Sequence, residues 1–383
     1  MRYTREDGCR AWLTQAMIPP STLLQLFEQF GSAEAIYEEF LDSDTTALHP
    51  YITPKSIRVL KQYAPRDEMH KIMLAMNNAQ MMIMAYSDPI YPDSLRNLDD
   101  PPVLLFYRGN PNCLHGRCVT MIGSRKASPT VMEDTRRIAY DLAQADVTVV
   151  SGLALGIDSA AHRGCLDAHG KTVGVMACGL DVDYPHENAD LRDEIIRSGG
   201  VLLSEAPPGS PVYSWRIPVR NRILSGLSAA VLMMECRVRS GSMTTVNHAL
   251  RQGRDVFAYP GVSGTEWAEG AQTLLNEGAT AFTSAHDVLA ELNWVQSFSA
   301  EAIRSRQPRA VRSVTLRQSE PQQQYDWNEA QQAIMQQLED GEQSYDQLAA
   351  ATGLSASVLS GELTMLQLLG CIKAMPGKMF RRI

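Results

Sequence analysis

The sequence predicts an α/β protein: an extended Rossmann-like, doubly wound and mainly parallel sheet, with a helical domain before it and a winged-helix domain after it. Three observations support this prediction. Apolar strand patterns alternate with helical patterns through residues 116–292. The segment before them, residues 1–75, has apolar side chains at helical spacing. Residues 325–383 combine compact helical patterns with a short basic strand at the end.

The N-terminal domain, residues 1–75, is predicted from helices that a glycine separates. Phe30-Gly31-Ser32 ends one helix and caps the next, and five apolar residues before it follow helical spacing: Leu23, Leu24, Leu26, Phe27 and Phe30. This segment resembles the small SAM-like or helix-hairpin modules of DNA-repair proteins. Its acidic charge favours the alternative, an interaction domain that does not touch DNA.

The core domain is predicted over residues 76–296, followed by a flexible linker over 297–324 and the winged helix over 325–383. The first long helix of the core is predicted to open at a capping box formed by Thr130 and Glu133, with Ser128-Pro129 as an alternative start. The linker is rich in Arg, Gln, Ser and Pro and lacks apolar periodicity.

Composition and charge restrict the class of protein. The chain has no stretch of eighteen or more apolar residues, so we expect no membrane span. Its seven cysteines form no C-x-x-C pair, and its charged N-terminus lacks a signal-peptide core, which together indicate a cytoplasmic protein. The net charge is −8, and residues 116–292 hold 16 basic against 20 acidic side chains. Any site for a polyanion must therefore be a local cluster of arginines and backbone amides.

Four short polar loops are predicted where apolar strands end. Loops at the carboxyl ends of parallel strands share one edge of the sheet, where ligands bind. Glycine permits close approach, backbone amides hold oxyanions, and arginine adds a two-pronged phosphate contact. These loops predict a site for a phosphate-rich ligand; their residues are Gly123, Ser124, Arg125, Ser151, Gly152, Arg220, Asn221, Arg222, Ser240, Gly241 and Ser242.

The helix after Ser151-Gly152 carries further candidates. Asp158 and His162 are four residues apart, so they share a helix face and pair or orient that loop. The alternative is an acid at a helix start and a histidine that faces the core. Gly152 and Gly156 give G-x-x-x-G, which is not the spacing of a dinucleotide-binding loop, so classical NAD binding is disfavoured.

Other ligand motifs are incomplete. Gly170-Lys171-Thr172 ends a helix and enters a strand, whereas a P-loop lysine lies at a helix start. Cys113, His115 and Cys118 offer three zinc ligands without a fourth at zinc-site spacing. We therefore expect no metal and no cofactor.

One loop leaves an enzymatic alternative open. Residues 260–265, Pro-Gly-Val-Ser-Gly-Thr, resemble the P-G-G-x-G-T loop of nucleoside-monophosphate phosphoribohydrolases, the lysine decarboxylase-like glycosidases. In that motif a catalytic glutamate follows the threonine by three residues. Ala268 occupies this position, and Glu266 and Glu269 lie at other offsets.

Taken together, the motifs resemble the DNA-processing protein A family (DprA, also called Smf) over most of the chain. The matching segments are 88–92 (DPIYP), 100–102 (DPP), 108–110 (RGN), 122–125 (IGSR), 151–158 (SGLALGID), 161–162 (AH), 178–181 (CGLD), 184–185 (YP), Asn188, 204–205 (SE), 220–223 (RNRI), 226–228 (GLS), 240–242 (SGS), 253–257 (GRDVF), 260–261 (PG), 352–355 (TGLS) and 376–377 (PG).

The resemblance implies a non-catalytic protein that binds single-stranded DNA without sequence preference and loads the RecA recombinase during natural transformation. It also implies a homodimer formed through the Rossmann-like core. Arg125 matches the family's DNA-contacting arginine, beside Gly123 and Ser124, and Arg220–Arg222 match its second loop. Arg125 and Arg222 are the main cations expected.

The chain departs from the family pattern at three places. Ser214 and Ile217 replace a frequent lysine and phenylalanine, and the nearby Tyr213 and Trp215 are candidates for stacking on bases. His186, which we expect to be mostly neutral at pH 7, replaces a frequent basic residue.

A third hypothesis is a duplex-DNA regulator that acts through the winged helix. Its expected recognition segment, residues 357–369, contains Glu362 and no Lys or Arg, and only Gln367 has a side chain suited to reading bases. This composition favours a protein contact over groove recognition.

Overall fold

The computed structural model describes residues 3–42, 48, 50–261, 267–295, 329–338, 341–354, 359, 363, 366, 372–375 and 379–382. The chain divides into two compact units, Met1–Ser305 and Arg306–Ile383. The predicted linker, residues 297–324, and Pro376-Gly377 lie outside the described residues. In the part of the chain that is described, no helix is both long and apolar enough to cross a membrane.

The N-terminal segment is helical, as predicted. Its helices are α1 (Arg5–Leu13), η1 (Thr14–Ala16), α2 (Pro20–Phe30), α3 (Ala33–Asp42), α4 (Pro54–Tyr63) and α5 (Arg66–Asn78). Trp12 fills their core, with the rings of Tyr37 and Phe40 edge-on to it at centroid distances of 5.1 Å. Because α5 continues to Asn78, the helical segment ends beyond the predicted boundary at residue 75. The SAM-like or helix-hairpin assignment stays a prediction.

The core contains a nine-stranded sheet in the order β1-β2-β6-β5-β4-β3-β7-β8-β9. The strands from β6 to β9 pair in parallel, whereas β2 is antiparallel to both its neighbours. The strands are β1 (Met82–Ala85), β2 (Leu104–Gly109), β3 (Arg117–Ile122), β4 (Val147–Ser151), β5 (Thr172–Val175), β6 (Val201–Ser204), β7 (Ala230–Met233), β8 (Asp255–Ala258) and β9 (Thr280–Ala281). The prediction of a mainly parallel, doubly wound sheet is therefore confirmed.

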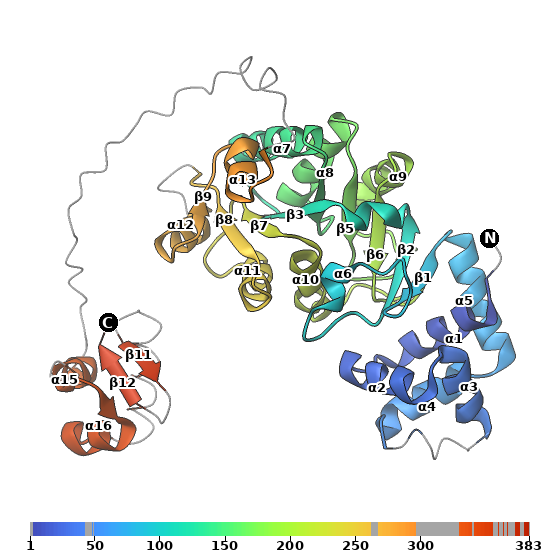
Figure 1. The fold of residues 1–383 in the computed structure, drawn as a ribbon, viewed down its shortest axis with the longest axis horizontal. Helices are drawn as coiled ribbons and strands as arrows, with labels where there is room; N and C mark the ends of the chain where they lie inside the picture. Colours follow the sequence, from blue (N-terminus) through green and yellow to red (C-terminus); the bar gives the residue numbers. More distant parts are fainter. Residues whose placement is uncertain are drawn as a thin grey trace. The chain divides into compact units, whose positions relative to one another are not determined.

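Helices cover both faces of this sheet (Figure 1). Apolar side chains of α7, α8 and α13 pack on one face, and those of α6, α10, α11 and α12 pack on the other. The core helices are α6 (Asp93–Arg96), η3 (Pro111–His115), α7 (Pro129–Gln144), α8 (Ile157–Asp167), η4 (His186–Asn188), α9 (Ala189–Arg197), α10 (Arg216–Leu227), α11 (Ser242–Arg251), α12 (Glu269–Asn276) and α13 (Ala285–Glu291).

The start of α7 corrects one sequence prediction. The Thr130–Glu133 capping box is wrong, because Ser128 is the N-cap and its hydroxyl oxygen accepts from the Val131 amide at 3.4 Å. Pro129 then takes the first helical position, where its missing amide hydrogen costs nothing and its fixed φ suits the helix. The alternative start that the sequence offered is the correct one.

The chain reverses its direction of travel across the sheet between β3 and β7. It begins the parallel region at β3, moves outward through β4 and β5 to β6, and then returns to place β7 on the other side of β3. The connections that follow β3 and β7 therefore start side by side at the carboxyl edge of the sheet and run toward opposite ends of it. In open α/β sheets this topological switch point is where ligands bind.

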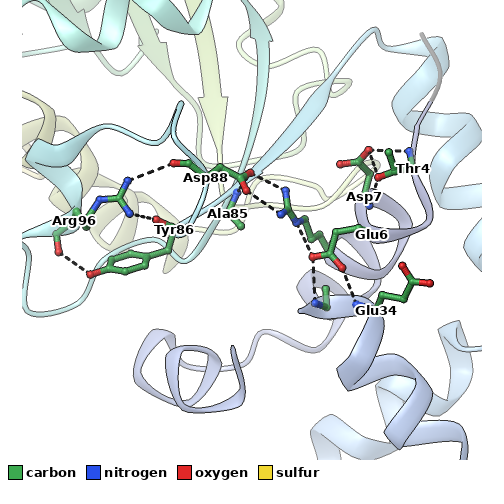
Figure 2. Close-up of polar contacts among 10 residues, drawn as sticks. Thr4, Glu6, Asp7, Glu34, Ala85, Tyr86, Asp88 and Arg96 are labelled. Carbon is green, nitrogen blue, oxygen red and sulfur yellow. Dashed lines mark hydrogen bonds and ion pairs between the residues drawn. The ribbon is translucent and has the colours of Figure 1, made fainter. Parts of the chain in front are cut away.

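An ion-pair network joins the N-terminal helices to the core (Figure 2). Arg10 on α1 donates two hydrogen bonds to the Asp88 carboxylate after β1, at 2.7 and 2.9 Å. Its Nε also donates to Glu6 at 2.9 Å, and Glu6 accepts from the amides of Ala33 and Glu34 at the start of α3. One carboxylate–guanidinium chain thus connects α3, α1 and the core.

The second unit has the elements of the predicted winged helix. Helices α15 (Glu329–Gln337) and α16 (Tyr345–Thr352) accompany a three-stranded antiparallel sheet, β10-β12-β11, formed by β10 (Gln343–Ser344), β11 (Ile372–Met375) and β12 (Met379–Arg382). Leu359, Leu363 and Leu366 are buried in its core. The remainder of the proposed recognition segment, including Glu362 and Gln367, lies outside the described residues.

Candidate nucleic-acid interface

Two loops meet at the switch point and are held together by hydrogen bonds. The loop after β3 begins at Gly123, and the loop after β7 leads into α11. The Ser124 amide donates to the Glu235 carbonyl at 2.7 Å, and the Ser242 hydroxyl donates to the Gly123 carbonyl at 2.8 Å. Gly123 and Ser242, from loops far apart in the sequence, are therefore neighbours, as the sequence predicted.

Glycine is required where the loop after β3 touches the start of α8. Gly156 has φ +78°, and a Cβ there would lie 2.4 Å from the Ser124 carbonyl oxygen. A Cβ on Gly123 would lie 2.6 Å from Cγ1 of Ile157. Both substitutions would push the loop off its support, because real contacts are never that short. The absence of a side chain at Gly156 thus lets the Arg125 loop pack directly against the start of α8.

Arg125 is the exposed cation at this edge. Its side chain is exposed and has no ion-pair partner among the described residues. Ser124, by contrast, is buried, and its hydroxyl oxygen accepts from the Lys126 amide at 3.0 Å, which closes the turn. Ser124 shapes the loop, and Arg125 and Lys126 extend from it into solvent.

Glu235 is a site residue that sequence reasoning missed. It is 1% exposed at the end of β7, and its carboxylate accepts from the Ser128 amide at 2.7 Å and the Ser128 hydroxyl at 3.2 Å. Its backbone carbonyl also receives the Ser124 amide. Glu235 therefore fixes both ends of the Arg125 loop. The available signal was a lone acid directly after the apolar run 229–234.

The loop after β4 differs from its sequence prediction. The Ser151 hydroxyl is fully buried and donates to the Met121 carbonyl at 2.7 Å, so it joins β4 to β3 rather than facing a ligand. The amides of Gly152 and Ala154 donate to the Asp158 carboxylate at 3.1 and 3.3 Å. The predicted open cradle of amides is therefore wrong here, because the helix supplies its own anion.

Asp158 performs the orienting role that was predicted for it, since it holds the loop by two amides. Burial raises the pKa of Asp158, although the nearby Arg220 guanidinium and the two amides act in the opposite direction. The predicted partnership with His162 is not formed. His162 instead shares a 2.7 Å hydrogen bond between its Nδ1 and the Thr172 hydroxyl.

Arg220 lies behind the edge rather than on it. Its guanidinium donates to the Gly152 carbonyl at 3.0 Å and to the Val175 carbonyl, so it joins the ends of β4 and β5. Burial lowers the pKa of Arg220. Together with Arg125, Gly152 and Tyr184 it lines a pocket of 80 Å³. One residue from each of the first two predicted loops, Arg125 and Gly152, therefore shares a concave site with Arg220, whereas Gly123, Ser124 and Ser151 do not line it.

Arg222 corrects the sequence prediction most clearly. Its side chain is 3% exposed, and its guanidinium donates to both oxygens of Glu205 at 2.6 and 2.7 Å and to the Asp100 carbonyl at 3.0 Å. Burial alone would lower the pKa of Arg222, but the Glu205 carboxylate outweighs it and raises the pKa. The expectation that Arg222 presents a main cation to the ligand is wrong.

The physical reason is that residues 220–222 form part of α10 instead of a loop. Successive residues of an α-helix point about 100° apart, so three adjacent side chains cannot face one ligand. Arg220 points to β4 and β5, whereas Arg222 points to the Glu205 side. Asn221 donates to the Thr244 hydroxyl at 2.7 Å and ties α10 to α11.

Aromatic rings flank the site before α10. Tyr213 and Trp215 are 44% and 49% exposed, and their rings stack with centroids 6.1 Å apart and planes 15° apart. The Arg216 guanidinium carbon lies 5.3 and 5.1 Å from the two ring centres. This exposed platform occupies the place where sequence analysis expected stacking side chains.

Two more arginines, Arg237 and Arg239, were missed by sequence reasoning. Both are exposed on the loop after β7, between Glu235 and the Ser240-Gly241-Ser242 turn. The Arg237 guanidinium lies 4.1 Å from the centre of the Trp267 ring. Glu235 and Ser242, which flank these arginines in the chain, bond to the Arg125 loop, so both arginines lie on the segment that is joined to that loop. The signal was an Arg-x-Arg directly before the small-residue turn.

His186 is paired with a neighbouring acid. Its Nδ1 hydrogen-bonds the Asp183 carboxylate, and this contact raises the pKa of His186. Its side chain is 85% exposed and follows Tyr184 and Pro185, which line the pocket at Arg125. The expectation of a mostly neutral side chain at pH 7 stays a prediction.

His162 gives the fold a specific sensitivity to acid. It is fully buried, and burial lowers the pKa of His162 to about 3, whereas an unfolded chain has a histidine pKa of about 6.5. Below about pH 6.5 the unfolded chain binds a proton on this histidine that the folded protein excludes, so the free energy of unfolding falls as pH falls. Between pH 7 and 4.5 this group alone is expected to remove about 2–3 kcal/mol.

The measurement is chemical denaturation of wild type and His162→Asn across that pH range. Asparagine retains a donor for Thr172 but does not titrate. The difference in unfolding free energy between the two proteins should decrease steadily below pH 6.5. Equal pH dependence of both proteins would contradict the inference.

The glycosidase alternative depends on a loop that is described only in part. Of its residues 260–265, positions 262–265 lie outside the described residues, and Ala268, at the position of the motif's glutamate, is 4% exposed. Among the residues that the structure describes, no group of three or more His, Cys, Asp and Glu side chains is arranged to hold a metal ion.

Comparison with known protein families identifies the family of this chain. Residues 82–293, which include every strand of the sheet, match the family model for DNA recombination-mediator protein A. The chain belongs to the DprA/Smf family. A second family model, the DprA winged helix domain, matches residues 318–378.

DprA relatives agree with this assignment. The DNA processing protein DprA of Streptococcus pneumoniae is 38% identical over 270 residues, which cover 70% of this chain and 93% of that protein. The X-ray structure of DprA from the same organism superposes with a TM-score of 0.64 at 33% identity and covers 76% of this chain and 99% of that one. The chain is therefore similar to a DNA processing protein over nearly that protein's full length.

A second DprA structure, from Helicobacter pylori, has a TM-score of 0.51 at 26% identity and covers 57% of this chain and 98% of that one. Its description concerns the single-stranded DNA binding mode of that protein.

Proposed function

We propose that this protein binds single-stranded DNA, without sequence preference, along the carboxyl edge of its sheet. The observation that carries the proposal is an exposed Arg125 on a loop fixed at the topological switch point by Glu235, Ser242 and Gly156. Such a loop presents its charge without reorganising, which favours phosphate binding. The Helicobacter pylori DprA structure, which concerns the single-stranded DNA binding mode of that protein, supports DNA binding by this chain.

Local charge explains how an acidic protein binds a polyanion. Arg125, Lys126, Arg237 and Arg239 are exposed on two hydrogen-bonded loops, although the chain carries a net charge of −8. Each phosphate that is neutralised on a single strand adds about −0.7 to the slope of log affinity against log salt. The expected slope therefore counts the cations in contact rather than the net charge.

Base contacts in this proposal come from stacking. The exposed Tyr213–Trp215 pair offers ring faces that accept any base, and stacking contributes about 1–3 kcal/mol per base. Backbone contacts and ring faces do not distinguish the four bases. This combination gives affinity without sequence preference.

The proposal is tested by fluorescence anisotropy with labelled oligo-dT over a range of salt concentrations. Arg125→Ala is expected to weaken binding about 10- to 100-fold, since a charge-assisted hydrogen bond contributes about 1.5–3 kcal/mol. It should also reduce the steepness of the salt slope by about 0.7. Duplex of equal length should bind more weakly than oligo-dT.

The matched control is Arg197→Ala. Arg197 is an exposed arginine at the end of α9, just before β6 and hence at the amino edge of the sheet. The Arg197→Ala substitution removes the same charge as Arg125→Ala, but it should leave the affinity for oligo-dT and the salt slope unchanged. Equal behaviour of the two variants would refute the proposed site.

We further propose that the bound strand is passed to the RecA recombinase, that the protein acts as a cytoplasmic homodimer, and that transformation and recombination are its setting. The family description as a recombination mediator supports this role. Arg125→Ala should slow RecA filament formation on coated single strands, and Arg197→Ala should not. A monomer mass by sedimentation at micromolar concentration would contradict the dimer.

The proposal assigns no catalytic step to the protein. Release of free base from nucleoside monophosphates by the purified chain would contradict it in favour of the glycosidase reading.

A further inference from the structure

A cavity of 260 Å³ lies where the N-terminal helices meet the core. Leu13, Met17 and Leu23 form one wall, from the segment α1–η1–α2. Trp215, from the turn before α10, and Glu205, after β6, belong to the opposite wall. The proposed function leaves this cavity unused, although it is larger than the 80 Å³ pocket at Arg125.

The cavity adjoins the proposed DNA site. Three residues, Met176, Ala177 and Arg220, line both the cavity and the pocket at Arg125. The two spaces therefore share a wall just after β5, and a strand whose phosphate contacts Arg125 lies close to the cavity. The side chain of Trp215 lines the cavity and stacks with Tyr213 outside it.

The chemistry of the lining selects a base rather than a phosphate. The charged groups of the lining are already engaged within the protein. Arg222 pairs with Glu205 and Asp100, Arg220 donates to backbone carbonyls, and Arg216 donates to the Ser210 hydroxyl, so none of these cations is left without a partner for a phosphate. Most of the remaining lining is apolar and includes Ile18, Pro19 and Leu23. Ligand sites of this kind combine apolar walls with a few polar groups, which suits the flat, uncharged surface of a nucleobase.

Polar contacts hold the N-terminal wall of the cavity against the core. Arg10 on α1 is joined to Asp88 of the core by two hydrogen bonds of 2.7 and 2.9 Å (Figure 2). At the cavity itself the Arg216 guanidinium lies 3.5 Å from the Met17 sulfur. The Met17 side chain is 56% exposed, so it borders the opening rather than the floor.

We propose that this cavity holds one base of the bound single strand, which makes the N-terminal helical domain part of the DNA site. The inference rests on the proposed function and adds a specific subsite to it. It replaces the sequence-based preference for a domain that does not touch DNA. The phosphates stay on the Arg125 loop while one base turns into the space between α2 and Trp215.

The first test fills the opening with Met17→Trp and uses Leu74→Trp as the control. Leu74 is 50% exposed on α5 and does not line the cavity. Loss of one base contact of about 1–3 kcal/mol predicts roughly 5- to 100-fold weaker oligo-dT binding for Met17→Trp. The salt slope should stay that of wild type, and Leu74→Trp should bind normally. An equal thermal midpoint in both variants excludes a folding defect.

An oligomer with abasic sites separates the base from the backbone. Met17→Trp and wild type should bind this oligomer equally, because it has no base to insert. Normal oligo-dT binding by Met17→Trp, with weak binding by Arg125→Ala, would overturn the cavity and leave the proposed function intact. Absence of oligo-dT binding by wild type would overturn the proposed function itself.

Photocrosslinking places the base directly. A strand that contains 5-iododeoxyuridine, irradiated on the wild-type protein, should give an adduct in the tryptic peptide 11–55, which includes Met17. Met17→Trp should reduce that adduct. Absence of any adduct in peptide 11–55, in a sample in which other peptides are crosslinked, would show that bases stay outside and would overturn the inference.

Discussion

Arg222→Met is expected to lower the free energy of unfolding by about 3 kcal/mol, because it leaves the Glu205 carboxylate without its partner. The pair is bidentate, at 2.6 and 2.7 Å, and Arg222 is 3% exposed. Removal of one member of a buried pair costs about 3–5 kcal/mol, and the lower end applies since Glu205 retains 29% exposure. Denaturant unfolding monitored by circular dichroism measures the change.

The double variant Arg222→Met/Glu205→Gln distinguishes this structural role from DNA contact. It removes both charges of the buried pair, and the Asp100 carboxylate that remains is 58% exposed and stays hydrated. The double variant should therefore recover much of the lost stability, since uncharged replacements of buried pairs are often neutral. Its salt slope for oligo-dT should equal that of wild type. A slope reduced by about 0.7 in the stable double variant would show that Arg222 contacts phosphate after all.

Gly156→Ala is expected to have an effect of similar size and to abolish tight DNA binding. Its Cβ would lie 2.4 Å from the Ser124 carbonyl oxygen and 2.8 Å from the Arg125 carbonyl carbon. The strained φ of +78° costs about 1–3 kcal/mol and the overlap about 1–3 kcal/mol more, with relief only if the Arg125 loop moves. Thermal unfolding and oligo-dT anisotropy measure the two consequences.

Gly253→Ala is the matched control. Gly253 has φ +66°, but a Cβ there meets nothing within 4 Å, and the residue lies after α11, outside the site. Gly253→Ala should lose only the stability that the strained backbone angle costs, and it should bind oligo-dT normally. If the two variants lose equal stability and both bind oligo-dT, the contact between Gly156 and the Arg125 loop is not what positions the cation.

Much of the fold was predictable because it depends on local pattern. Alternating apolar runs and helical spacings predicted the doubly wound sheet, and Gly123 and Arg125 stand where a strand gives way to a helix. Gly152 was predicted to permit a close approach, and the structure shows which atoms its Cβ would meet: the Arg220 guanidinium and the Asp158 carboxylate. Each of these signals acts within a few residues, so sequence alone carries it.

The errors arose where a side chain's partner is distant in the sequence. Arg222 pairs with Glu205 and Asp100, and Ser151 bonds across to Met121. Nothing near either residue indicates those partners. Glu235 and the Arg237–Arg239 segment were missed for the same reason: their importance depends on β7 lying beside β3, which the chain reaches only after passing through β4, β5 and β6.

The sequence by itself determined the α/β architecture, the position of the glycines and the presence of an arginine just after β3. The tertiary structure decided which arginines remain available, because burial and ion pairing depend on neighbours brought together by strand order. It left Arg125 exposed, neutralised Arg222 with Glu205, and placed the N-terminal helices beside Trp215. Charge that is counted in a sequence becomes a binding surface only where folding leaves it unpaired.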